Sequence, residues 1–274
     1  MSMRALQSSP GLIAPVTALL CSLAGAGSAH AGILFSDGFA YANGDLAGNA
    51  GGTGWAVGSQ WTGGTGAGGN KVSGGSVRIA SRSSVTTRTL STTYLAGITS
   101  YFVSFVFNAS PFEMGHAGVT LTLASDATQS LFMGMPGGSG QLGFDWTNRG
   151  DGLYAATNAT NYLVLFEIRA GASVTSVLMY ATTNLSMSGS ALAATTAVAS
   201  LMNEPMFSFD TVRFSGDYNP GVISLAGLAM ADNPMDAVAF TQSAVPGPAP
   251  LALGVIAGAF GGCGGPARRR RRDG

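Results

Sequence analysis

The sequence predicts an all-β domain of the sandwich or jelly-roll class, preceded by a leader and followed by a short tail. The central region is rich in Gly, Ser, Thr, Ala and Val and poor in Lys and Glu, so helix formers are scarce and turn formers are frequent. In residues 119–123, Val and Leu alternate with Thr, as expected for a strand with one buried face. Residues 101–107 are apolar on both faces except at Ser104, which is typical of a central strand.

The first 31 residues are predicted to be a signal peptide. Arg4 supplies a positive start, residues 11–26 are mostly apolar, and Ala29-His30-Ala31 is a small-x-small cleavage site before Gly32. Cys21 follows Leu20, where a lipoprotein signal requires a small residue, so lipidation is not expected. Residues 1–31 are therefore expected to be removed during export.

The domain is expected to occupy residues 32–244, with at least eight strands and no convincing helix. Residues 44–75 are dense in glycine and are predicted to drape over the sandwich as a surface lead-in, because Trp55 and Trp61 require burial. The segment 191–202 is small and apolar, and it is either a short helix or a loop under a sheet edge. The predicted strands are 71–80, 85–90, 101–107, 119–123, 162–169, 174–180, 209–214 and 222–230.

Charge and cysteine content exclude several classes of function. The domain holds seven basic and twelve acidic residues, a net charge of −5, so nothing basic remains to attract nucleic acid. Cys21 lies in the leader and Cys263 in the tail, so the domain has neither a disulfide nor thiol chemistry. About 210 residues are enough to build a stable core without cross-links.

The tail, residues 245–274, has the composition of a membrane segment. Residues 249–267 carry no charge, and a helix of that length reaches ~28 Å against a hydrocarbon core of ~30 Å. Only residues 251–260 are strongly apolar, so the span is marginal. The cations that follow would keep this end cytoplasmic and the domain outside. A short helix with a solvated basic end is a weaker alternative, and a nucleic-acid-binding tail is weaker still.

The layout of the tail resembles the PEP-CTERM sorting signal of exported Gram-negative proteins. That resemblance implies an exosortase, a membrane cysteine transpeptidase, as partner and removal of the tail beyond the proline-rich motif. The central Glu of the family motif is Gly247 here, which leaves cleavage at this motif open. The matching residues are Val245, Pro246, Gly247 and Pro248, the apolar segment 251–260, and Arg268, Arg269, Arg270, Arg271 and Arg272.

The domain opens with FSDGFAYANGDLAGNAGGTGWAVGSQW, residues 35–61. This stretch is similar to the start of exported bacterial proteins with concanavalin A-like, LamG-type jelly rolls. The resemblance extends over residues 35–237, including the later segments YFVSFVF, LFMGMPG, NYLVLFEI and FDTVRFSG, and it implies that fold. The Asp-Glu pair that is frequent in the final strand of those proteins is replaced by Ser224-Leu225-Ala226. The opening matches are Phe39, Tyr41, Gly44, Leu46, Gly48, Gly51, Gly52, Gly54, Trp55 and Trp61.

The sequence offers no catalytic constellation, and we predict that the protein is not an enzyme. Glycoside hydrolysis generally needs two carboxylates at a fixed separation, but Glu113, Glu167 and Glu204 are isolated from one another. Glu167 alternates with Arg169 and is expected to be a solvated strand residue. His116 is the one histidine of the domain, and no Gly-x-Ser-x-Gly elbow accompanies it.

Two kinds of ligand can be considered for the domain. A carbohydrate would need exposed aromatic rings, for which the candidates are Trp146, Tyr154, Tyr162 and Tyr218. A structural calcium ion, which LamG-like sandwiches often hold, could take oxygens from Asp145, Asn148 and Asp151, although a plain turn between strands is favoured there. No other cofactor is expected.

These features together predict an exported protein of structural or binding type at the cell surface or in the extracellular matrix. It would be sorted by an exosortase-like enzyme, held transiently in the inner membrane by its tail, and associated with extracellular polysaccharide. A carbohydrate-binding module on the sandwich is the first alternative, and a glycoside hydrolase is the second.

Overall fold

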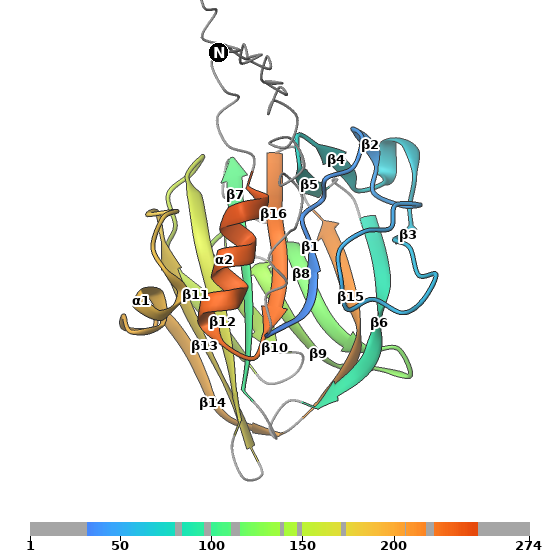
Figure 1. Ribbon diagram of the computed structural model, residues 1–274. Coiled ribbons are helices and arrows are strands. Elements are labelled where there is room, and N and C mark those ends of the chain that lie inside the picture. Colours follow the sequence, from blue (N-terminus) through green and yellow to red (C-terminus); the bar gives the residue numbers. More distant parts are fainter. Residues whose placement is uncertain are drawn as a thin grey trace, which may run out of the picture.

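The computed structural model describes residues 32–79, 84–95, 100–110, 116–137, 140–146, 150–170, 174–205, 207–217 and 222–245. In this part of the chain, two antiparallel sheets face each other, as the sequence predicted (Figure 1). The all-β sandwich prediction is therefore confirmed at the level of architecture. The predicted leader, with Ala29 and Ala31, and the tail from Pro246 to the end, with its proline motif, apolar segment and arginines, lie outside the described residues.

The larger sheet has nine described strands in the order β14-β13-β12-β7-β16-β5-β4-β2, and β1 pairs with β16 beside this path. The strands are β1 (Ile33–Asp37), β2 (Gly44–Asp45), β4 (Lys71–Ser73), β5 (Ser76–Ile79), β7 (Tyr101–Ser110), β12 (Asn161–Ala170), β13 (Val174–Thr182), β14 (Ala199–Pro205) and β16 (Val222–Ala231). The predicted hairpin around Gly171 is the β12–β13 pair.

The smaller sheet has seven described strands in the order β11-β10-β9-β8-β15-β6-β3. They are β3 (Thr62–Gly63), β6 (Ser84–Leu95), β8 (His116–Leu123), β9 (Asp126–Met135), β10 (Leu142–Trp146), β11 (Gly150–Tyr154) and β15 (Ser208–Asp217). A short 3₁₀ turn, Gly66–Gly68, precedes β4. The alternation read in residues 119–123 corresponds to β8, in which Val119 and Leu121 are buried in the main core between the sheets.

A second, smaller core lies on the outer face of the nine-stranded sheet, beneath two helices, α1 (Gly189–Ala193) and α2 (Pro234–Ala244). Figure 1 shows α2 lying over β7 and β16. The expectation of no convincing helix is wrong for α2. Its polar and apolar residues are not gathered into separate stripes, so the periodicity that reveals a helix is weak. The predicted helix or loop at 191–202 is divided between α1 and the edge strand β14.

A bulge in β16 fixes the position of α2 on the sheet. The register of β16 against β7 shifts between Ala226 and Ala229, and Gly227 within it has φ of 61°. The Thr241 hydroxyl donates a hydrogen bond to the Gly227 carbonyl (2.7 Å), and a Cβ at residue 227 would lie 2.6 Å from the Thr241 carbonyl oxygen. Glycine is required here both by the left-handed backbone and by the close approach of the helix.

The glycine-dense lead-in is held against the sandwich, and the predicted burial of its tryptophans is confirmed. Trp61 is fully buried and Trp55 is 9% exposed. Val245 ends α2 as its C-cap and packs against the smaller core. Among the described residues, neither helix has the length and apolar character that crossing a membrane requires.

Candidate functional site

A row of outward-facing side chains crosses the seven-stranded sheet at right angles to its strands. Each member is the direct ladder partner of the next, so the row is fixed by strand register and not by proximity in the sequence. Core residues such as Val119, Phe144 and Phe214 flank the row along the strands, which places its members on the opposite face. From β6 to β10 the row is Thr87, Arg213, Thr120, Phe132 and Asp145.

Four members of the row, Arg213, Thr120, Phe132 and Asp145, line a groove with a volume of about 340 Å³. The volume lies at the lower end of the range for small-molecule pockets. Polar and apolar groups both line it, which suits a ligand with both kinds of surface. The lining residues are His116, Thr120, Ser130, Phe132, Pro136, Gly137, Asp145, Arg213 and Ser215.

Phe132 is the aromatic ring of the groove, and a glycine makes room for it. The ring lies over the backbone of Gly118, where a Cβ would come 2.8 Å from Phe132 Cζ. The imidazole of His116 contacts the ring edge-on, with 5.9 Å between centroids. Gly118, Gly134 and Gly143 are ladder partners and form the neighbouring row of the sheet. This row has no side chains, so it leaves space beside the ring. Phe132 is thus half-buried with one part of its ring facing the groove.

Arg213 is the cation of the groove. Its Nε is shielded from solvent and has no hydrogen-bond partner within the described part of the chain. Its ladder neighbours, Thr87 and Thr120, carry no charge. Asp145 lies three strands away, about 14 Å at the usual spacing of ~4.8 Å per strand. The groove therefore has a cationic end and an anionic end, with the Phe132 ring between them.

Of the predicted glycan-binding aromatics, Trp146 was wrongly placed on the surface. It is 2% exposed, and its ring packs on Phe207 with 4.9 Å between centroids. Trp146 follows Asp145 on β10, and alternation turns the tryptophan into the core when the aspartate faces outward. Tyr162 is buried, and its hydroxyl accepts a hydrogen bond from the Thr157 backbone N–H (2.8 Å).

Tyr154 is half-buried at the edge strand β11, where its ring packs edge-on against Tyr162, with 6.1 Å between centroids. Tyr218 lies outside the described residues. Tyr154 is not among the residues that line the groove. The aromatic ring of the groove is instead Phe132, which the sequence analysis did not single out.

The predicted calcium residues do not come together as a described metal site. Asp145 faces the groove and pairs with Asp151 across the β10–β11 ladder, while Asn148 lies outside the described residues. Among described side chains, no three His, Cys, Asp or Glu residues are close enough to share a metal ion. Calcium binding here stays a prediction. Asp145 is also the single carboxylate in the described lining of the groove, whereas glycoside hydrolysis generally uses two.

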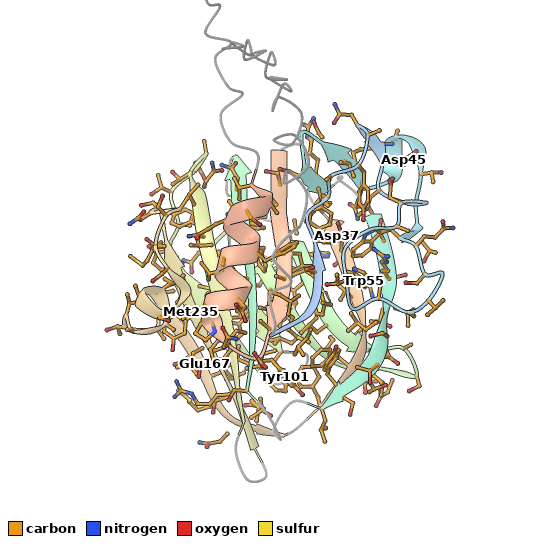
Figure 2. The ribbon with its side chains drawn as sticks, in the orientation of Figure 1. Asp37, Asp45, Trp55, Tyr101, Glu167 and Met235 are labelled. Carbon is orange, nitrogen blue, oxygen red and sulfur yellow. The ribbon has the colours of Figure 1, made fainter. Side chains whose placement is uncertain are left out.

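Glu167 is not the solvated residue that the sequence predicted. It is 9% exposed on β12, where its carboxylate accepts hydrogen bonds from Arg169 Nε and from the Tyr180 hydroxyl, both at 2.9 Å. Burial, followed by the hydrogen bond to Glu167, raises the pKa of Tyr180 to about 12. Figure 2 shows Glu167 on the sheet that carries α2, away from β1. Its contacts are those of a structural ion pair on the outer face of the nine-stranded sheet.

A second polar cluster surrounds Asp37 at the end of β1 (Figure 2). The Arg88 guanidinium lies 4.4 Å from the centre of the Trp55 ring and 3.3 Å from Asp37 Oδ2. Its Nη1 also donates to the Gly51 carbonyl (2.8 Å), its Nη2 to the Ser59 carbonyl (3.1 Å) and its Nε to the Ser59 hydroxyl (3.4 Å). A pocket of about 410 Å³ lies beside it, lined by the lead-in itself. Because its hydrogen bonds are directed to the lead-in, Arg88 anchors that segment to the sandwich.

The comparisons with known proteins give no family for this chain. No protein-family model matches the sequence, and neither does any curated protein. Lectin II from Ulex europaeus is similar at 10% identity and a TM-score of 0.41, over 64% of this chain and 92% of that one. The structure described as HCR/D-Sa-GBL1/C is similar at 10% identity and a TM-score of 0.48, over 74% and 51%.

The globular domain of T. cruzi calreticulin is similar at 12% identity and a TM-score of 0.41, over 62% of this chain and 77% of that one. These similarities are too distant to assign functional residues of the other proteins to positions in this chain. The two-sheet architecture therefore rests on the strand pairing of this chain, and the function has to be argued from its own groove.

Proposed function

We propose that this protein is a carbohydrate-binding protein and that the groove on its seven-stranded sheet holds the sugar. A pyranose has an apolar face of C–H groups and a rim of hydroxyls. It therefore binds best where an accessible aromatic ring is surrounded by hydrogen-bonding side chains. The groove offers the ring of Phe132, the hydroxyls of Thr120, Ser130 and Ser215, and the carboxylate of Asp145.

The observation that carries the proposal is the position of Phe132. A half-buried phenylalanine on a polar sheet face loses part of the free energy that full burial would give it, roughly 25 cal/mol per Å² of apolar surface left in water. Gly118 and His116 hold the ring in this position and leave part of it open to the groove. A sugar that stacks on the ring would remove that surface from water.

The test is to compare Phe132→Ala with Phe102→Ala. Phe102 is also a half-buried phenylalanine, but it lies on the outer face of the nine-stranded sheet, next to the smaller core. Affinity electrophoresis of the full-length chain through a panel of polysaccharides should find at least one that retards it. Phe132→Ala should weaken that binding at least about tenfold, a loss of roughly 1.4 kcal/mol. Phe102→Ala should bind as the wild type does.

Circular dichroism of both variants separates loss of binding from loss of fold. Equal binding by Phe132→Ala and the wild type would place the ligand elsewhere. Absence of retardation in every polysaccharide would leave the protein without a carbohydrate ligand and would overturn the proposal.

We also propose that the protein is exported and reaches the cell surface or the extracellular matrix. The charged and apolar leader with its Ala29-His30-Ala31 site supports export, and the tripartite tail supports sorting by an exosortase-like enzyme. The intact mass of the protein extracted from the cell surface tests both ends. Removal of residues 1–31 and of the segment after Pro248 is expected, and a full-length mass in the cytoplasm would contradict both.

A further inference from the structure

We propose that the groove selects acidic carbohydrates, and that the anionic group of the sugar pairs with the guanidinium of Arg213. This inference rests on the proposed function and adds the chemical class of the ligand. The shared chemistry is an oxyanion on a sugar ring, supplied by a carboxylate in a uronic acid or by a sulfate ester. Arginine suits both because its planar donors match two oxygens at once.

The first observation is that Arg213 has a shielded donor without an acceptor. Its Nε is buried and has no hydrogen-bond partner in the described part of the chain. A buried N–H of a charged group costs free energy when it makes no hydrogen bond. Native structures therefore normally provide it with an acceptor from the protein, from water or from a ligand. The flanking residues in the ladder, Thr87 and Thr120, bring no charge to balance the guanidinium.

Three other cations in the described chain show the usual arrangement, while Arg78 makes no ion pair with a described carboxylate but is exposed to solvent. Lys71 pairs with Asp45, Arg88 with Asp37, and Arg169 with Glu167. Arg213 makes no such pair with a described carboxylate, although it lies on the same kind of sheet surface and is partly shielded. A cation that is kept unpaired in a concave site is available to a ligand.

The second observation is the order of groups along the row. Arg213 and Phe132 are separated by one residue, Thr120, which places their Cα atoms about 10 Å apart. An extended arginine side chain covers more than half of that distance, so a sugar stacked on Phe132 could present a ring substituent to the guanidinium. The spacing fits a single sugar unit between the two side chains.

Asp145 gives the groove a direction. It is the ladder neighbour of Phe132 on the side away from Arg213. Its carboxylate can accept hydrogen bonds from sugar hydroxyls, but it repels an anionic substituent. A charged sugar would therefore bind with its oxyanion toward Arg213 and its hydroxyls toward Asp145. The domain as a whole has a charge of −5, so its net charge does not attract polyanions, and the selectivity has to come from this local arrangement.

The experiment compares matched pairs of polymers on the full-length chain by affinity electrophoresis. Polygalacturonate is tested against the same polymer with its carboxyl groups reduced to alcohols, and dextran sulfate against dextran. The wild type should bind at least one acidic polymer ten or more times more tightly than its neutral counterpart. The pair that shows the preference identifies carboxylate or sulfate as the oxyanion.

Two arginine substitutions then assign the preference. In Arg213→Gln the ratio between acidic and neutral polymers should fall to about one, and in Arg213→Lys it should be intermediate. Arg78→Gln is the matched control, because Arg78 is an exposed strand arginine on β5 of the opposite sheet and its loss changes the net charge equally. It should keep the wild-type ratio. If Arg213→Gln does not fold, Arg213→Lys takes its place, and its lower ratio between acidic and neutral polymers tests the assignment.

The outcomes separate this inference from the proposed function. If acidic and neutral polymers bind equally, and Phe132→Ala weakens both, the groove binds carbohydrate but the acidic class is wrong. If Arg78→Gln and Arg213→Gln reduce the preference alike, the effect is one of net charge and the assignment to Arg213 is wrong. If no polymer binds, the proposed function is wrong, and the inference that rests on it is wrong as well.

Discussion

Replacing Asp37 by alanine should destabilise the domain more than any other single carboxylate change considered for this chain. The carboxylate is 1% exposed and accepts four hydrogen bonds. The donors are the Phe39 backbone N–H (2.8 Å), the Tyr41 hydroxyl (2.6 Å), Trp61 Nε1 (2.9 Å) and Arg88 Nη1 (3.3 Å). It thus joins the end of β1 to the lead-in and to β6.

The magnitude follows from what the substitution leaves behind. The Arg88 side chain is 4% exposed, and removing its carboxylate leaves a buried charge without compensation, which costs about 3–5 kcal/mol. The Trp61 N–H would also lose its acceptor, at about 1–3 kcal/mol, although such losses overlap and do not simply add. We expect at least about 3 kcal/mol at pH 7. Total stabilities of 5–15 kcal/mol are usual, so the variant would be marginal.

The pH dependence carries a definite sign. Burial raises the pKa of Asp37 above its usual value, against the opposing effect of its hydrogen bonds and of Arg88. A raised native pKa contributes stability that is fully present below the unfolded pKa of about 3.9 and is lost as pH rises through the native value. The difference in unfolding free energy between wild type and Asp37→Ala should therefore be larger at acidic pH than at pH 7.

Urea unfolding followed by tryptophan fluorescence measures the effect, since Trp55 and Trp61 lie in the cluster itself. Asp45→Ala is the matched control, because Asp45 pairs with Lys71 at the exposed end of the lead-in (Figure 2). Its loss should change the urea midpoint little. A midpoint for Asp37→Ala that equals that of Asp45→Ala would refute the view that the buried pair anchors the lead-in.

Two further predictions concern the stability of the nine-stranded sheet. Because the pKa of Tyr180 is raised to about 12, the stability that its hydroxyl contributes is complete below pH ~10 and is lost as pH rises through about 12. The difference in unfolding free energy between wild type and Tyr180→Phe should shrink by roughly 1–2 kcal/mol over that interval, and a constant difference would contradict the assignment. Cleavage after Ala31 would leave the α-ammonium of Gly32 beside α2, where a Cβ on Gly32 would be 2.3 Å from Asp232 Oδ1 and 2.7 Å from Asp236 Oδ2. Acetylating that amine should lower the unfolding free energy by up to about 1 kcal/mol in urea titrations, and unchanged stability would show that the amine makes no ion pair there.

The sequence predicts the sandwich well because period-two alternation depends only on which face is buried. Residues 119–123 reveal β8 in this way, whereas residues 101–107 reveal β7 as a run that is apolar on both faces except at Ser104. Alternation fails where a polar residue is buried with a partner from another strand. Glu167 reads as solvated because its partner Tyr180 belongs to β13, and only the β12–β13 pairing brings the two together. The helix α2 is missed because its polar and apolar residues are not gathered into separate stripes, so the sequence carries little helical periodicity.

Strand register decides which residues line the groove, and composition does not encode register. The groove could therefore not be predicted as a unit. Phe132 and Asp145 come from the consecutive strands β9 and β10, whereas Arg213 comes from the distant strand β15. A slip of one residue in any of these ladders would turn that side chain into the core. A partial signal is nevertheless present. Arg213 and Asp145 each stand between two core residues, in Val-Arg-Phe and Phe-Asp-Trp, which requires both charged groups to face outward. The alternation that turns Trp146 into the core thus turns Asp145 outward, onto a surface that a ligand can reach. The ligand should therefore be sought on the strand face that carries the isolated charges, not on the face that carries the largest rings.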